Sequence, residues 1–193
     1  MTKRSKYVAI SIVGAAAFAL AGCREETVDA QAFPDQQSCE AAAATDGLFP
    51  VADCDAAFAE ANRLHVEAAP RYDSLEVCET EHGPGACGSE DQVANTGSGS
   101  IFMPLLAGYL IGNMLGGRSG LAAGQPLYKT ADGRYTNAAR TSTYSSNAGR
   151  ATLGASQFTR PQATIGQAPM TKATAASRGG FGNTGAARGV SGG

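Results

Sequence analysis

Ile101-Phe-Met-Pro-Leu-Leu-Ala-Gly-Tyr-Leu-Ile-Gly-Asn-Met-Leu115 is the most apolar stretch of the chain after its N-terminal apolar run. We expect a short, apolar, glycine-rich helix over residues 97–117, with Pro104 in its first turn, where proline is tolerated. As a helix the stretch would be about 22 Å long, less than the roughly 30 Å of a bilayer core. The length therefore favours a buried helix of a soluble module. A half-inserted membrane helix and a self-association helix stay open.

Three glycines recur at every fourth position of this stretch, namely Gly108, Gly112 and Gly116. In a helix they would leave one side nearly bare, and such small-xxx-small spacing lets two backbones approach closely. Each glycine costs an isolated helix about 1 kcal/mol relative to alanine. We therefore expect the glycine row to be a packing interface.

The preceding segment, residues 35–96, is predicted to be an acidic helical module with four cysteines, which are Cys39, Cys54, Cys78 and Cys87. An even number of cysteines in a short exported segment predicts a disulfide framework, for which three connectivities are open. Two similar Cys-Glu units, each followed by a glycine-containing loop, favour the local pairs Cys39–Cys54 and Cys78–Cys87. Each bridge would close a loop of roughly 10–15 residues and stabilise the fold by about 3 kcal/mol or less.

Helical signals surround these cysteines. Asp35, Asp53 and either Asp73 or Ser74 are placed to cap three helices. The second helix has one apolar face that ends before Pro70 and is made by Phe58, Ala61, Leu64, His65 and Ala68. The sequence therefore predicts a small, mostly α-helical, disulfide-stapled module followed by the apolar glycine-rich helix.

The C-terminal half has the composition of a largely disordered region. Residues 118–137 are expected to form a β-hairpin, because Asp132-Gly133 suits a type I′ turn between Tyr128 and Tyr135. Residues 138–193 are Ala, Thr, Ser, Gly and spaced Arg without periodicity, which predicts a basic low-complexity tail. Nucleic acid is not expected as a partner of an exported chain.

The N-terminus carries the strongest targeting signal. Lys3, Arg4 and Lys6 precede an apolar run, and Leu20-Ala21-Gly22-Cys23 resembles the lipobox of bacterial lipoproteins. The resemblance implies a signal peptide over residues 1–22, lipidation of Cys23 and a membrane as partner.

Residues 23–34 are predicted to be a polar tether reaching at most about 40 Å. In lipoproteins Asp after the lipidated Cys favours the inner membrane. Arg24 in that position implies a periplasm-facing protein of the cell envelope, more at the outer membrane than at the inner.

Charge divides the chain into two halves. Residues 24–96 carry 16 acidic and three basic side chains, giving −13, whereas residues 118–193 carry nine basic and one acidic, giving +8. Such a division suits an acidic module joined to a basic arm, and equally two segments kept soluble by charge. An anionic envelope surface, or self-association, would complement the basic arm.

Enzyme motifs are lacking in this sequence. It has two histidines, His65 and His82, and no Gly-x-Ser-x-Gly, His-Glu-x-x-His or Cys-x-x-Cys. A metal site of Cys78 with His82 and His65 would match no common zinc spacing. We therefore expect no catalytic residues, no cofactor and no metal.

The chain as a whole resembles the YgiB-like family of uncharacterised bacterial envelope proteins. The resemblance rests on Leu20-Ala-Gly-Cys23, the four cysteines, Gly99-Ser-Ile-Phe-Met-Pro-Leu-Leu-Ala-Gly-Tyr109, Gln125-Pro-Leu-Tyr128 and Arg178-Gly-Gly-Phe-Gly182. It implies no established activity and no catalytic residues. Genes of this family often lie beside genes for glutathionylspermidine-synthase-like proteins. Through the resemblance, this neighbourhood implies a link to polyamines or to envelope stress. We expect a lipid-anchored, non-enzymatic binding or structural protein. The alternatives are a polycation-, polyamine- or stress-linked envelope factor, or an enzyme without a recognisable motif.

Overall fold

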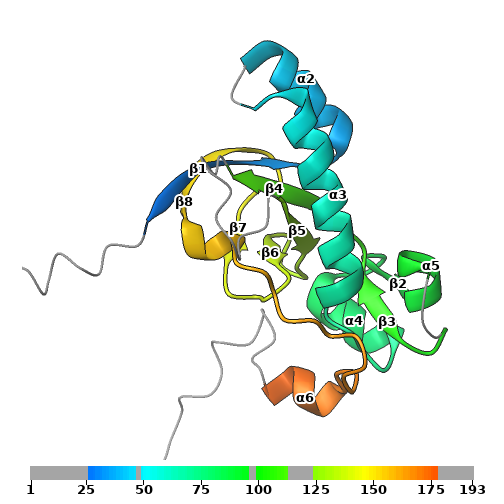
Figure 1. Cartoon of the computed structure of the whole chain (residues 1–193). Coiled ribbons are helices and arrows are strands. Elements are labelled where there is room, and N and C mark those ends of the chain that lie inside the picture. The colour runs from blue at the N-terminus through cyan, green and yellow to red at the C-terminus, as the bar shows by residue number, and fades with distance from the viewer. Residues whose placement is uncertain (1–25, 47–48, 96–98, 113–123, 178–193) are drawn as a thin grey trace, which may run out of the picture.

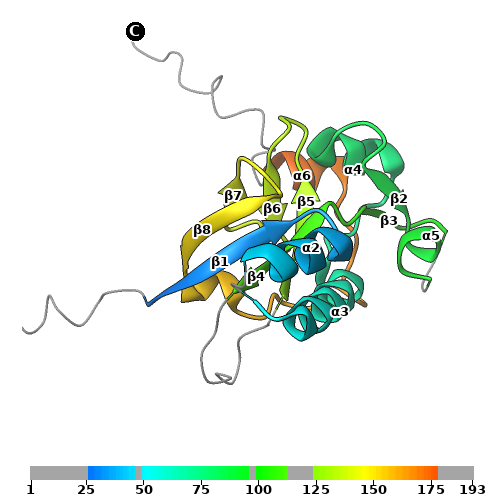
Figure 2. The same cartoon turned by 90° about the horizontal axis from the view of Figure 1, so that it is seen from above.

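An antiparallel sheet of six strands is the centre of the fold, and it curls into a half-barrel (Figure 1, Figure 2). The computed structural model describes residues 26–46, 49–95, 99–112 and 124–177. In the sheet the strands are ordered β7-β6-β5-β4-β1-β8. Their bounds are β1 Thr27–Phe33, β4 Gly108–Gly112, β5 Gly124–Lys129, β6 Tyr135–Asn137, β7 Thr143–Tyr144 and β8 Gly149–Gly154. The prediction of a mostly α-helical protein is therefore wrong, because helices cover a sheet that carries the fold.

Two helices, α2 (Gln36–Asp46) and α3 (Val51–Ala68), pack on one face of this sheet. The side chain of Asp35 accepts a hydrogen bond from the Ser38 amide at 2.7 Å, which confirms the first predicted cap. The helix α3 begins two residues before Asp53, with Pro50 at its N-cap. Its buried face is close to the predicted one, and consists of Cys54, Ala57, Ala61, Leu64, His65 and Ala68.

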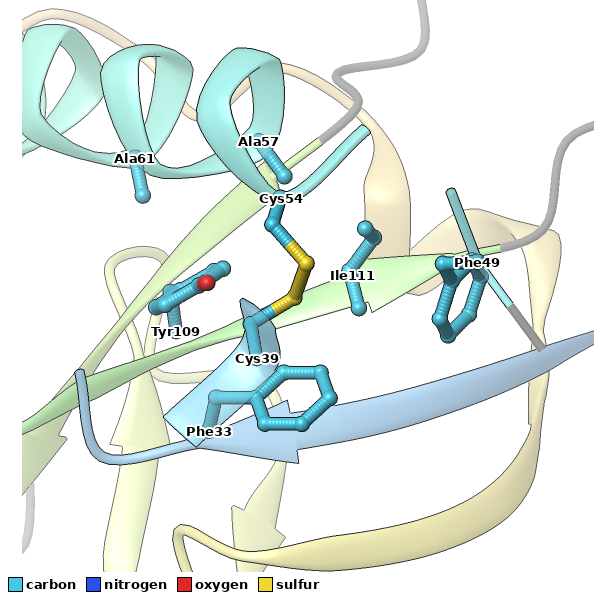
Figure 3. Close-up of a cluster of buried hydrophobic side chains, with 8 residues drawn as sticks. All are labelled: Phe33, Cys39, Phe49, Cys54, Ala57, Ala61, Tyr109 and Ile111. Atoms are coloured by element: carbon cyan, nitrogen blue, oxygen red, sulfur yellow. A yellow bond between two sulfur atoms is a disulfide. The ribbon is translucent and has the colours of Figure 1, made fainter. Parts of the chain in front are cut away.

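The apolar core lies between these helices and the sheet, around the Cys39–Cys54 disulfide (Figure 3). We use the name apolar core for Phe33, Cys39, Phe49, Cys54, Ala57, Ala61, Tyr109 and Ile111. Small alanines on α3 let the helix approach the strands closely, so that the backbone of Ala57 lies against Gly124. A Cβ atom at position 124 would be 2.0 Å from the Ala57 carbonyl oxygen. Glycine is therefore required there by packing.

A second, two-stranded sheet pairs β2 (Cys87–Ser89) with β3 (Phe102–Pro104). Beside it lie α4 (Leu75–His82) and α5 (Glu90–Ala94) (Figure 1). The Ser74 side chain caps α4 by accepting from the Val77 amide. A disulfide joins Cys78 of α4 to Cys87 of β2. Both disulfides thus follow the local pairing that the two sequence units favour.

The apolar stretch 101–115 is not a helix in its described part. It forms β3 and β4, and β4 is an interior strand that pairs with β1 on one side and β5 on the other. Tyr109 and Ile111 face the apolar core, while Leu110 faces the opposite side of the sheet. The local preference of the stretch is overridden by pairing with two strands, β5, which follows next in the chain, and β1, which lies far away in the sequence.

The glycine spacing explains why the two structures are hard to tell apart. Four is an even number, so residues four apart share one face of a strand as they do of a helix. Gly112 adjoins the ring of Phe158, where a Cβ atom at position 112 would lie 2.7 Å from Cζ of that ring. Gly108 adopts φ +145° beside the Phe33 carbonyl. Both glycines are tightly packed within the chain, on a strand. Gly116 lies outside the described residues.

The predicted tether is also corrected, because Thr27–Phe33 is β1, an interior strand between β4 and β8. Ala30 and Ala32 alternate toward one face, where small side chains gave no visible apolar pattern in the sequence. Residues 1–22 and Cys23 lie outside the described residues. Within the described ranges, every helix is too short or too polar to cross a bilayer.

The predicted tail is ordered as far as residue 177. It contributes β7, β8, a 3-10 turn η1 (Ala155–Phe158) and α6 (Lys172–Ser177). Strand β8 pairs with β1 through its backbone, which needs no apolar alternation, and the fully buried Phe158 anchors the segment. The hairpin between β5 and β6 is present, with Asp132-Gly133 at its turn. Residues 178–193 are not described.

Candidate functional site

Buried polar side chains lie where the C-terminal end of α3 meets α4 and the β5–β6 hairpin. We call Tyr72, Glu81, His82 and Arg140 the polar cluster. The Tyr72 hydroxyl lies 2.7 Å from Glu81 Oε2 and 2.8 Å from His82 Nε2. Glu81 Oε2 also pairs with the Arg140 guanidinium. These side chains are at most 13% exposed, so their charges are balanced inside the protein.

The hydrogen bonds of the polar cluster constrain its protons. His82 Nδ1 lies 2.7 Å from the Lys129 carbonyl oxygen, which can only accept, so Nδ1 carries a proton. In the neutral ring Nε2 is then an acceptor, as is the Glu81 carboxylate. The single hydroxyl proton of Tyr72 can satisfy only one of these two acceptors. The Tyr72 hydroxyl therefore donates to Glu81 Oε2, and its oxygen adjoins His82 Nε2.

Burial determines the charge of the histidines in this region. It lowers the pKa of His82 to about 4, with Arg140 acting in the same direction and the Lys129 carbonyl and Glu81 opposing it. Burial and the charge of Arg71 lower the pKa of His65 to about 4. The Nδ1 atom of His65 lies 3.1 Å from the Tyr128 hydroxyl. Both imidazoles are therefore neutral at pH 7.

Arg71 cross-links the end of α3 to other elements. Its Nε donates to Glu90 Oε1 at 2.7 Å, its Nη2 donates to the Val66 carbonyl at 2.8 Å, and its Nη1 donates to Thr164 Oγ1 and the Ala69 carbonyl. The last carbonyl oxygens of a helix have no donor within the helix, so they need donors from elsewhere. Arg71 therefore holds the region in place and leaves its positive charge next to an adjoining cavity.

This cavity, of about 310 Å³, lies between residues 68–71, residues 138–140 and the segment 161–170. In Figure 1 that segment is the orange trace that leads to α6. The cavity wall combines polar side chains with apolar ones, and Pro70, Pro161 and Met170 are among the apolar members. Arg71 and Arg140 are its charged residues, and within the described part of the chain no Asp or Glu lines it. A concave site where charged and polar groups converge beside apolar surface can bind a small molecule.

The residues that the sequence predicts as sites are not members of the polar cluster. The four cysteines form two disulfides, and Cys78 is thereby withdrawn from a metal site with His82. In the described ranges no three His, Cys, Asp or Glu side chains are grouped so that they could hold a metal ion. Sequence reasoning missed Tyr72, Glu81 and Arg140. No local signal joins them, because Glu81 belonged to the acidic module and Arg140 to the supposed tail.

Comparison with known proteins places the chain. A family profile described as a protein of unknown function (DUF1190) matches residues 27–192. The chain belongs to the DUF1190 family. A UPF0441 protein of Klebsiella pneumoniae subsp. pneumoniae is 31% identical over 190 residues, covering 91% of this chain and 79% of the relative. A UPF0441 protein of Pectobacterium carotovorum subsp. carotovorum is 32% identical over 197 residues, covering 95% and 82%. These relatives confirm the resemblance to an uncharacterised bacterial family.

No solved structure matches the chain. The DUF1190 match begins at Thr27, the first residue of β1, and includes the whole polar cluster and the cavity wall. The family domain is therefore the sheet with its covering helices and C-terminal segment, rather than the four-cysteine region alone.

Proposed function

We propose that this DUF1190 protein is a lipid-anchored cell-envelope protein whose domain acts as a non-enzymatic binding module at a membrane surface. The observation that carries the proposal is the short distance along the chain between the lipobox-like Cys23 and β1. Arg24, Glu25 and Glu26 alone separate Cys23 from Thr27. Four residue steps span at most about 14 Å. Acyl chains on Cys23 would hold the first residues of β1 almost at the bilayer.

The partners we propose follow from this position. The membrane is the first, through the lipid on Cys23, and the outer membrane is favoured over the inner because Arg24 follows the cysteine. A second is an anionic envelope surface or another copy of the chain, bound by the basic C-terminal segment. Screening by salt would weaken this second contact but not the lipid anchor.

The burial and hydrogen bonding of the two histidines favour a binding role over catalysis. The chain has two, His65 and His82, and they are 4% and 0% exposed. Each is hydrogen-bonded within the fold, to Tyr128 or to Tyr72 and Lys129. A general base must come within hydrogen-bond reach of its substrate. Neither imidazole offers that access.

Replacement of the anchor cysteine tests the proposal. We expect Cys23→Ala to lose palmitate labelling and to leave the membrane fraction of intact cells, because several acyl chains supply about 0.8 kcal/mol per buried CH₂. Ser11→Ala, inside the apolar run, is the matched control and should fractionate like the parent protein. Membrane association and labelling that persist in Cys23→Ala would refute the anchor.

A second variant tests the choice of membrane. Arg24→Asp keeps the cysteine and should move the protein from the outer to the inner membrane on a density gradient. Arg24→Lys is its control and should stay with the outer membrane. Identical distributions of the two variants would contradict sorting by this position.

A further inference from the structure

The cavity beside Arg71 and Arg140 has its positive charges on the wall and their counterions behind it. Glu81 and Glu90, which pair with Arg140 and Arg71, are 2% and 6% exposed and are absent from the wall. A ligand in the cavity would therefore meet two guanidinium groups before any carboxylate. This arrangement favours negative charge in the ligand.

Both arginines are paired within the fold, Arg71 with Glu90 and Arg140 with Glu81. Arg71 is engaged by Glu90, Thr164 and two carbonyl oxygens, so it contributes mainly its fixed charge. Arg140 follows β6 in the left-handed conformation, φ +58°, with its amide donating to the Asn137 carbonyl at 3.0 Å. This conformation is uncommon for a residue other than glycine. It directs a planar guanidinium, which matches carboxylate and phosphate geometry, to the cavity wall.

The outer wall of the cavity is attached to the rest of the fold at Thr164 and at Met170. The Thr164 amide donates to the Glu67 carbonyl at 2.8 Å, and the Met170 amide donates to the Arg71 carbonyl at 2.7 Å. Between these two points the chain is exposed, including Ala168. A segment attached at two points can admit a small molecule without disturbing the sheet.

We propose that this cavity binds a small organic oxyanion. Its carboxylate or phosphate group contacts Arg140, and its apolar body packs between Pro70, Pro161 and Met170. A volume of about 310 Å³ is at the lower end of small-molecule sites, which suits a ligand of metabolite size. The inference deepens the proposed binding role and rests on it. The lipid anchor is tested in cells and this site on purified protein, so the two can fail separately.

Binding is measured on the full-length protein in detergent, by calorimetry and by the shift in Tm. The probes are glutarate and phenyl phosphate, with neutral glutaramide and inorganic phosphate as comparisons. We expect saturable binding and a raised Tm with glutarate, phenyl phosphate or both, and neither with glutaramide. Glutarate alone would identify a carboxylate site, and phenyl phosphate alone a phosphate site. Inorganic phosphate should bind more weakly than the organic anion because it lacks an apolar body.

Two variants locate the site. Arg140→Gln should weaken binding about tenfold or more, since a charge-assisted hydrogen bond is lost. Arg134→Gln is the matched control, because Arg134 is exposed and pairs with Asp132 on the hairpin. Arg140→Gln also removes the partner of Glu81, so Ala168→Phe serves as a second variant that fills the cavity from an exposed position and keeps both arginines. It should abolish binding at an unchanged starting Tm.

The proposal is overturned if neither anion binds up to about 10 mM. It is equally overturned if glutaramide binds as well as glutarate, or if Ala168→Phe binds like the parent protein.

Discussion

Tyr72 and Tyr109 are both fully buried, yet they belong to interiors of different kinds. Tyr109 lies in the apolar core with its ring 5.9 Å from that of Phe33 and 5.6 Å from that of Phe58. Its hydroxyl has no hydrogen-bond partner among the described residues. The Tyr72 hydroxyl, in the polar cluster, lies within 2.8 Å of both Glu81 and His82.

The difference shows how one small domain uses two kinds of stabilisation. The apolar core is stabilised by burial of apolar surface and by the Cys39–Cys54 disulfide. Neither depends on hydrogen bonds, so the core tolerates a tyrosine hydroxyl without a partner. The polar cluster depends on directional bonds, and removing one partner leaves another buried group unsatisfied. We expect the polar cluster to be sensitive to charge and pH, and the apolar core to be sensitive to side-chain volume.

The largest effect is expected from Glu81→Leu. This change leaves Arg140 without its buried carboxylate, which should lower the free energy of unfolding by about 3–5 kcal/mol. Urea denaturation monitored by circular dichroism measures it. The control is Glu67→Leu, because Glu67 pairs with Arg63 at an exposed position and should cost less than about 1 kcal/mol. Equal losses for the two variants would mean that the polar cluster is not a stabilising network.

The second prediction is that the polar cluster, unlike the apolar core, makes stability depend on pH. Burial lowers the pKa of His82 from 6.5 to about 4, so between these values the unfolded chain binds a proton that the folded chain does not. Stability should fall as the pH drops from 6.5 towards 4 and level off below, with a total of about 3 kcal/mol for this residue.

Comparing the parent protein with His82→Gln isolates the contribution of His82, because the other ionisable groups are common to both proteins. The variant should show a flatter dependence of unfolding free energy on pH over this interval. His65 should contribute a similar slope, since burial and the charge of Arg71 lower its pKa to the same range. Parallel curves for parent and variant would contradict a neutral buried His82.

Sensitivity to side-chain volume is tested by Gly112→Leu, on the face of the sheet opposite the apolar core, where Phe158 packs. The new side chain would collide with the ring of Phe158, because even a Cβ atom there lies 2.7 Å from Cζ. Overpacking of this kind costs about 1–3 kcal/mol. Thr152→Leu, on the exposed face of edge strand β8, is the control and should change the midpoint of urea unfolding little. A Gly112→Leu protein as stable as the parent would show that the Phe158 packing is loose.

The last comparison removes one oxygen atom from each tyrosine, and it includes the smallest expected effect, that of Tyr109→Phe. Tyr72→Phe should cost about 1–3 kcal/mol, because it removes the hydroxyl that donates to the buried Glu81 carboxylate. Tyr109→Phe should be neutral or slightly stabilising, since its hydroxyl is buried without a partner in the described structure. Thermal unfolding of both variants makes the comparison directly. A costlier Tyr109→Phe would reverse our assignment of the two interiors.

Several features of the fold were predictable because they depend on neighbouring residues. Asp35 and Ser74 cap helices through bonds to amides three residues ahead. The disulfides close short loops, with sequence separations of 15 and 9. Asp132-Gly133 turns a hairpin between adjacent strands. The sequence by itself also indicates the lipidation signal at Cys23, which stays a prediction.

The strands of the central sheet were decided by tertiary structure. Phe33 pairs with Tyr109, and Ala30 with Ala151, across separations that no local pattern records. The glycine row is compatible with both a helix and a strand, and only the partners β1 and β5 choose between them. The polar cluster and its cavity likewise exist only because the fold brings Arg140 to Glu81. Helix caps, short disulfide loops and the hairpin turn could be predicted from the sequence because their partners are close along the chain. Sheet pairing and buried ion pairs could not, because they depend on contacts that form only when the whole chain has folded.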